Sequence, residues 1–147
     1  MLTRCAWVLL LTLSVSAGQE APRLSLRERA EKGDADAQFT LAKNYEAGRG
    51  GLKRDYAEAE RWYLRAAEQG DPFAQASLAI LFRFGKGVAQ DYAQAYKWFY
   101  LAASRTTGSD RDSIVELRDS TAARMTADQI AEASRLAREW KPKPKAE

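Results

Sequence analysis

The sequence predicts an all-α fold in which pairs of helices stack into a solenoid, and three observations support this prediction. A block of about 37 residues occurs twice, because Ala-Glu-Lys-Gly-Asp (30–34) returns as Ala-Glu-Gln-Gly-Asp (67–71). Apolar residues within each block recur at helical spacing. Aspartates precede these runs and glycines follow several of them. Repeat periods in this range are typical of solenoids, in which each unit buries its apolar face against the next.

The two blocks match over most of their length. Gly85-Lys86-Gly87 follows Gly48-Arg49-Gly50 by 37 positions, and Trp98 follows Trp62 by 36. The first block therefore has one extra residue in the loop after its glycines. We place the repeats at about 30–66 and 67–103, and a C-terminal cap at 109–140.

The first 17 residues have the layout of a cleaved signal peptide. Arg4 gives a positive start, residues 5–15 are apolar, and Val15-Ser16-Ala17 supplies small residues before a cut. The apolar run is far shorter than the ~20 residues of a membrane-spanning helix. We therefore expect a bacterial protein that is periplasmic or secreted, with no transmembrane anchor after cleavage and a solenoid domain over residues 18–140.

The composition excludes several kinds of chemistry. The chain has no histidine, and its one cysteine, Cys5, lies in the expected signal peptide. Disulfides, thiolate or histidine catalysis and Cys/His zinc sites are therefore not expected, and no metal or cofactor is predicted. Loss of Arg4 from the 23 basic residues leaves 22 against 20 acidic ones, a balance that does not favour nucleic acid as a partner.

A short helix over residues 24–32 precedes the repeats, with Leu24, Leu26 and Ala30 facing the first repeat and Gly33 ending it. The first helix of each repeat follows at about 35–47 and 72–84.

Asp34 and Asp71 are suited to cap the first helices, and Gly48 and Gly85 to end them. The second helices are expected at about 56–68 and 92–104, after Asp55 and Asp91. Their buried stripes are Tyr56, Ala59, Trp62, Tyr63 and Ala66, and Tyr92, Ala95, Trp98, Phe99 and Ala102.

The third unit lacks the glycine and Asp-Tyr signals. A helix is predicted at 110–124, with Ile114, Leu117 and Ala122 turned inward. Thr126 and Gln129 form a capping box before a last helix, whose inward residues are Ile130, Ala133, Ala137 and Trp140. This pair of helices caps the array, and residues 141–147 form a basic, flexible, solvated tail.

The repeated residues resemble the Sel-one-like repeat (SLR) family, a relative of the tetratricopeptide repeat. The pattern Ala-x-x-x-Leu-Ala-x-x-Tyr, Gly-x-Gly and Asp-Tyr-x-x-Ala-x-x-Trp-(Tyr/Phe)-x-x-Ala-Ala-x-x-Gly covers about half of the chain, within residues 30–104. The resemblance implies a right-handed α-solenoid of antiparallel helix pairs. It also implies an adaptor or scaffold that is not an enzyme.

In this family arrangement the first helices line the concave face, where the second repeat carries an unusual apolar set. We predict a groove there that binds a protein or peptide through Phe39, Lys43, Phe73, Ile80, Arg83 and Phe84. The alternative is that the C-terminal unit folds over Ile80 and Phe84 as part of the cap. The repeated Gly-x-Gly loops are interpreted as turns and the tryptophans as core.

Two other functions stay open. The first is a cell-wall-associated ligand-binding protein or β-lactam-related enzyme, because some cysteine-rich secreted relatives are linked to β-lactams. Its nucleophile would be Ser77 or Ser104, although the chain has no Ser-x-x-Lys motif and no disulfides. The other is a membrane-surface tether through Lys141, Lys143 and Lys145.

Overall fold

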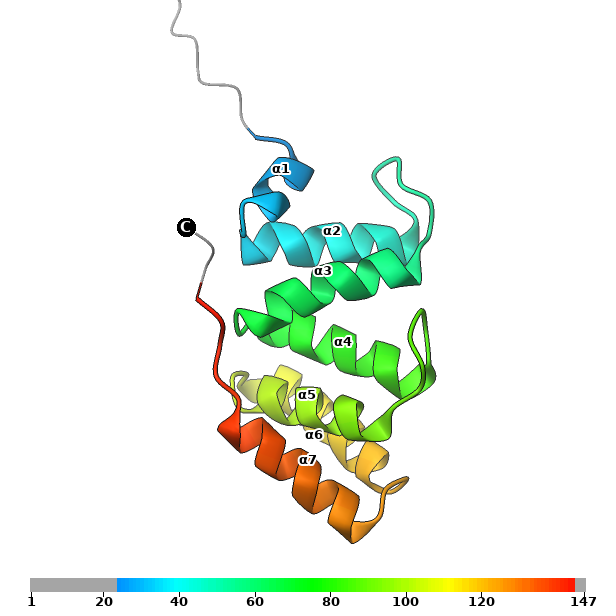
Figure 1. The fold of residues 1–147 in the computed structure, drawn as a ribbon, viewed down its shortest axis with the longest axis vertical. Helices are drawn as coiled ribbons and strands as arrows, with labels where there is room; N and C mark the ends of the chain where they lie inside the picture. The colour runs from blue at the N-terminus through cyan, green and yellow to red at the C-terminus, as the bar shows by residue number, and fades with distance from the viewer. Residues whose placement is uncertain (1–23, 145–147) are drawn as a thin grey trace, which may run out of the picture.

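The computed structural model describes residues 24–144, and every regular element in that range is an α-helix. In chain order the helices are α1 (Leu26–Glu31), α2 (Ala35–Ala47), α3 (Tyr56–Glu68), α4 (Pro72–Phe84), α5 (Tyr92–Ala103), α6 (Gly108–Ala122) and α7 (Ala127–Glu139). They stack into an elongated array with α1 at one end and α7 at the other (Figure 1). The predicted α-solenoid is confirmed, and the predicted signal peptide lies outside the described residues.

Each repeat is a helix hairpin that begins with the same cap. α2 packs against α3 and α4 against α5, and contacts between α3 and α4 join the two pairs. Asp34 and Asp71 accept hydrogen bonds from the N–H groups of Ala37 and Ala74, at 3.1 and 2.7 Å. These bonds confirm both aspartates as N-caps, because they satisfy donors that the first helical turn leaves without a partner.

Two glycines of the second repeat have different structural roles. Gly85 ends α4 with a left-handed φ of 64°, as predicted. At Gly87, a Cβ atom would lie only 2.6 Å from the carbonyl carbon of Tyr56. The loop after α4 therefore rests directly on the start of α3, and only glycine permits that approach.

The core combines large aromatic side chains of the second helices with alanines and leucines of the first. Trp62, Tyr63, Trp98 and Phe99 are buried, and each contributes about 2–3 kcal/mol through burial. Their burial confirms the predicted stripes, although the tyrosines that open them are only half-buried.

A buried glutamine ties each first helix to the helix before it. Gln38 donates a side-chain N–H to the carbonyl of Ala30, and Gln75 makes the same bond to Ala67, both at 3.0 Å. The accepting carbonyls lie at helix ends, where intrahelical donors are missing. The glutamines match in the repeat, but periodicity alone does not reveal this bond.

Helix α1 is shorter than predicted. It begins at Leu26 because Ser25 and Glu28 form a capping box. Leu24 precedes the cap and is 43% exposed, so it does not join Leu26 and Ala30 against the first repeat.

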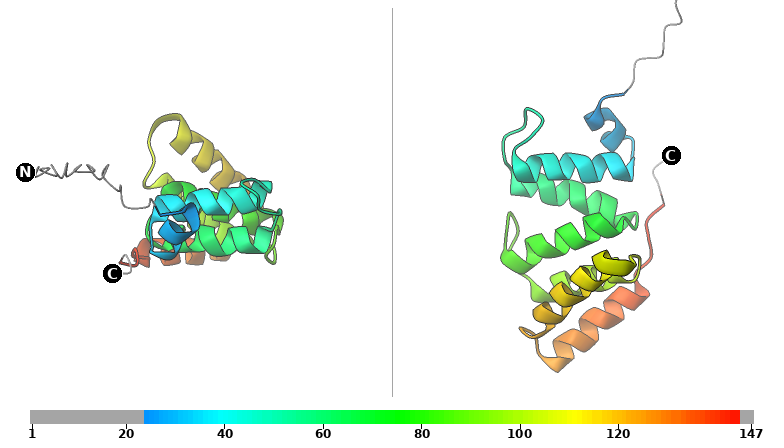
Figure 2. Two further views of the ribbon diagram at one scale, coloured as in Figure 1. Left: turned by 90° about the horizontal axis from the view of Figure 1, so that it is seen from above. Right: turned by 180° about the vertical axis from the view of Figure 1, so that it is seen from behind.

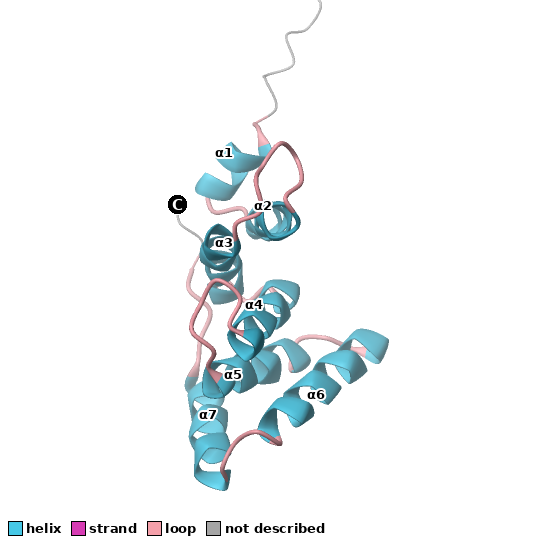
Figure 3. Ribbon diagram, turned by 90° about the vertical axis from the view of Figure 1, so that its right-hand side faces the viewer, coloured by secondary structure: helices cyan, strands magenta, loops and turns pink. Residues whose placement is uncertain are grey.

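The C-terminal unit contains both predicted helices, but they do not pack as a pair. α6 and α7 both pack against α5 and make few contacts with each other. Figure 2 shows α6 standing out from the stack, and Figure 3 shows α6 and α7 diverging from a shared turn. The capping box of Thr126 and Gln129 is confirmed. On α6 the fully buried residue is Thr121 in place of the predicted Ala122.

The described part of the tail is not free. The N–H of Lys143 donates to the carbonyl of Glu68, and the Lys143 ammonium pairs with the Glu68 carboxylate, both at 2.7 Å. One of the three lysines of the predicted membrane tether is therefore engaged within the molecule.

Candidate functional site

A cavity lies on the side of the first helices, where α6 diverges from α4 (Figure 3). We call it the groove. Its volume is about 330 Å³, and side chains of α2, α3, α4 and α6 line it. The lining residues are Phe39, Lys43, Glu46, Tyr63, Phe73, Ala76, Ser77, Ile80, Asp110, Ser113, Ile114 and Leu117.

Three aromatic rings form one wall of the groove. The ring centroid of Phe39 is 5.8 Å from that of Tyr63 and 6.4 Å from that of Phe73. Tyr63 is buried and Phe39 is half-buried, whereas Phe73 remains 48% exposed. Phe73 therefore exposes apolar surface beside a packed aromatic ring. A side chain held in this way is suited to contact a partner.

Charged groups surround these rings. The Lys43 ammonium lies 5.5 Å from the centroid of Phe39, in cation–π geometry. Tyr63 donates its O–H to the Glu46 carboxylate at 2.6 Å. Burial, together with this hydrogen bond, raises the pKa of Tyr63 well above its ordinary value, so the hydroxyl keeps its proton. Asp110 is an exposed carboxylate on the α6 side, so acidic groups outnumber Lys43 around the groove.

The structure brings four of the six predicted groove residues together. Phe39, Lys43, Phe73 and Ile80 line the groove, whereas Arg83 and Phe84 do not. These two border a separate cavity of about 240 Å³, which they share with Gln90, Tyr92 and Arg124.

Arg83 has a role within the fold. Its Nη1 donates to the carbonyl of Leu117 at 3.2 Å and to the hydroxyl of Ser120 at 2.7 Å. Both acceptors lie on α6. The predicted contact of Arg83 with a partner therefore competes with two bonds that fasten α6 to α4.

The apolar residues on α4 were predicted to form either a groove or part of the capping core. Each prediction holds for some of these residues. Ile80 is half-buried against the core and shares the groove with Ile114 and Leu117 of α6. Phe84 is 56% exposed and lies outside the groove. The C-terminal unit thus covers part of the middle of α4 and leaves its two terminal phenylalanines exposed.

Several groove residues were not predicted as part of the site. The spacing of Asp110, Ser113, Ile114 and Leu117 places them on one face of α6, but their approach to Phe73 depends on the tilt of that helix. The sequence carries no signal for that tilt, because the third unit lacks the repeat motif.

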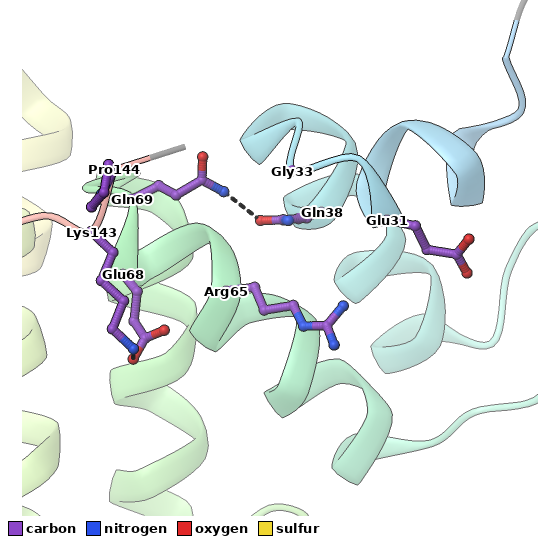
Figure 4. Close-up of a pocket in the computed structure, with 8 residues that line it drawn as sticks. All are labelled: Glu31, Gly33, Gln38, Arg65, Glu68, Gln69, Lys143 and Pro144. Carbon is purple, nitrogen blue, oxygen red and sulfur yellow. Dashed lines mark hydrogen bonds and ion pairs between the residues drawn. The ribbon is translucent and has the colours of Figure 1, made fainter. Parts of the chain in front are cut away.

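A third cavity, of about 330 Å³ like the groove, lies beside the turn between α3 and α4. Figure 4 shows its polar lining, in which the side chain of Gln69 donates to that of Gln38 at 2.8 Å. Of the serines in the enzyme alternative, Ser77 lines the groove together with Lys43. Within residues 24–144, Ser77 and Ser104 have no hydrogen bond to a lysine, and Ser104 donates to the Leu101 carbonyl.

Two further properties concern the same described residues. No group of three or more acidic, histidine or cysteine side chains is placed to hold a metal ion. None of the helices from α1 to α7 is both long and apolar enough to cross a membrane.

A stack of helix hairpins with an open apolar groove defines a helical-repeat protein of the kind that binds other macromolecules. Comparison with known proteins makes this specific: the family model described as Sel1 repeat matches residues 35–71 and 72–106. The ERAD-associated E3 ubiquitin-protein ligase component HRD3A of Arabidopsis thaliana is 35% identical over 76 residues. That match covers 51% of this chain but only 11% of HRD3A.

Two solved structures are similar in fold and sequence. One is c5321, a protective antigen present in uropathogenic Escherichia coli strains and displaying an SLR fold. It superposes with a TM-score of 0.71 at 35% identity, over 78% of this chain and 24% of c5321. The other is a Sel1 repeat protein from Oxalobacter formigenes, with a TM-score of 0.51 at 30% identity, over 78% of this chain and 96% of that one.

The chain belongs to the Sel1 repeat family, which is the Sel-one-like repeat family that its motifs resemble. Proteins of this family are generally protein–protein interaction modules and typically non-enzymatic scaffolds.

Proposed function

We propose that this protein is an exported, non-enzymatic adaptor that binds a segment of another protein in the groove. The observation that carries the proposal is Phe73, which is 48% exposed although it packs beside Phe39 in a cavity. Aromatic side chains held in this way dominate the energy of protein interfaces, because a partner buries them at little entropic cost.

The lining indicates the chemistry of the partner segment. An apolar side chain fits between Phe73 and the α6 residues Ile114 and Leu117. A basic side chain next to it on the partner complements Asp110 and Glu46, which lie at the same cavity. We therefore expect a segment that combines aliphatic or aromatic anchors with lysine or arginine.

Export is the second part of the proposal. It rests on the charged start, the apolar run and the small residues of the first 17 positions.

Photo-crosslinking in the native host tests the binding site. A photoreactive phenylalanine is placed at Phe73, and, as a matched control, at Leu136 of α7, which is 41% exposed but outside the groove. We expect a discrete crosslinked protein from position 73 that is absent from position 136. Crosslinks that are equal at both positions, or none from position 73, would contradict the proposal.

A further inference from the structure

The segment after α7 connects parts of the stack that are not neighbours. In a solenoid each unit contacts only the adjacent ones, and here α7 packs against α5. Residues 141–144 run back along the stack, past α5, to the end of α3 (Figure 1). We call residues 140–144 the strap.

Trp140 fixes the direction in which the strap leaves α7. Its ring meets that of Trp98 edge to face, with centroids 6.1 Å apart. The Arg105 guanidinium lies over the Trp140 ring, 4.8 Å from its centroid. The backbone of Trp140 is extended, with φ −67° and ψ 140°, so the chain turns away from the helix axis at a well-packed residue.

The far end of the strap lies against the end of α3 and the turn that follows it. Pro142 lies over Gly70, where an added Cβ would be 3.8 Å from the proline ring. The N–H of Lys143 donates to the carbonyl of Glu68, the last residue of α3, at 2.7 Å. The Lys143 ammonium also pairs with the Glu68 carboxylate at 2.7 Å, and Figure 4 shows the two side chains together.

The composition of the strap lowers the cost of ordering it. Pro142 and Pro144 have a fixed φ and bias the lysines before them toward extended backbone. Proline also lacks a backbone N–H, so the alternating prolines leave few backbone donors in the strap. The N–H of Lys143 is one of these donors, and it forms a hydrogen bond. The Glu68 carbonyl that accepts it is one of those that a helix end leaves without an intrahelical donor.

We propose that residues 140–144 are an intramolecular strap that ties α3 to α7 across α5 and fixes the spacing of these three helices. The strap holds the layer of second helices, whereas α2, α4 and α6 carry most of the groove. It therefore limits the bending of the array, and it does so whether or not the groove binds a partner. The exposed ion pair alone is weak. The strap therefore depends on the packing of Trp140, the position of Pro142 over Gly70 and the Lys143 backbone hydrogen bond acting together.

Amide hydrogen exchange of the full chain tests the strap. Four proteins are compared: wild type, a truncation after Trp140, Lys143→Met, and Lys141→Met as a control that removes the same charge from an exposed neighbour. In wild type the Lys143 amide should exchange at least about tenfold more slowly than in a peptide of residues 139–147. Truncation should speed exchange at the α3 end and in α7 several-fold, Lys143→Met should do so partly, and Lys141→Met should match wild type.

Two hydrogen-exchange results would overturn the proposal. One is a Lys143 amide that exchanges at the peptide rate in wild type. The other is a truncated chain, shown to be folded by circular dichroism, in which exchange at the α3 end is unchanged. A wild-type dimer that becomes monomeric on truncation would also overturn it, because the tail would then bridge two copies.

Discussion

At the scale of single residues, equivalent positions of the two repeats differ in electrostatics. The hydrogen bond from the Ala37 N–H, helped by Arg29, lowers the pKa of the N-cap Asp34. At the equivalent Asp71, burial raises the pKa of the carboxyl, and the nearby Asp36 adds to the effect. The surroundings of the N-cap aspartate thus favour its ionised carboxylate in repeat 1 and disfavour it in repeat 2.

Asparagine at these two positions should have opposite effects, because it caps a helix without a charge. The lowered pKa of Asp34 contributes stability that is present above its unfolded pKa and is lost as pH falls through the folded pKa. The raised pKa of Asp71 means that its ionised form costs stability, and this cost disappears at low pH. At pH 7 we expect Asp71→Asn to gain and Asp34→Asn to lose about 0.5 kcal/mol in urea unfolding. Equal shifts in one direction would contradict this interpretation.

Gly87 and Gly51 separate backbone strain from close packing. Both have a left-handed φ, of 72° and 78°, but a Cβ at Gly51 meets nothing within 4 Å. Gly51→Ala should therefore cost about 1 kcal/mol of unfolding free energy through conformation alone. Gly87→Ala should cost about 2–4 kcal/mol, because its Cβ also collides with the backbone of Tyr56. Urea midpoints that fall equally for the two variants would show that the loop does not rest on α3.

At the scale of elements, two residue differences between the repeats explain how α6 is attached to α4. In repeat 1, Tyr63 donates to Glu46. The equivalent residues of repeat 2 are Phe99 and Arg83, so the hydroxyl is missing and the acid is replaced by a base. Arg83 extends instead to the Leu117 carbonyl and Ser120 on α6.

Removing this arginine should loosen α6 selectively. Arg83→Met keeps the aliphatic length and loses both bonds, so we expect faster amide exchange along α6, no change in α2 and α3, and a loss of about 1 kcal/mol. Lys86→Met, which removes the same charge from the adjacent loop, is the control. If α6 amides exchange alike in both variants, Arg83 does not hold the helix.

The sequence predicted those elements that carry the repeat signals. Asp34, Asp55, Asp71 and the glycines indicated the bounds of α2, α3 and α4, because caps and left-handed turns are local features. The third unit has no such signals at its start, so its first helix was predicted two residues late and its separation from α7 was not foreseen. Phe39 and Phe73 were found from helical spacing, whereas Asp110 depends on the tilt of α6, which tertiary packing decides.

At the scale of the whole molecule, the proposed export predicts the first residue of the mature protein. Cleavage after Ala17 would leave Gly18 as the first residue of the mature protein. Intact mass of the protein recovered from the envelope or medium should therefore correspond to residues 18–147. A full-length species confined to the cytosol would contradict the proposed localisation.

The groove is proposed to be the binding surface of the protein. This proposal is tested most directly by the dissociation constant of the crosslinked partner, measured with purified proteins for wild type, Phe73→Ala and Leu136→Ala. The two side chains are similarly exposed, at 48% and 41%, so both variants should stay folded and lower the urea midpoint by similarly small amounts. The account predicts binding weakened about tenfold or more by Phe73→Ala and less than about twofold by Leu136→Ala. Unchanged affinity of a folded Phe73→Ala protein would contradict it.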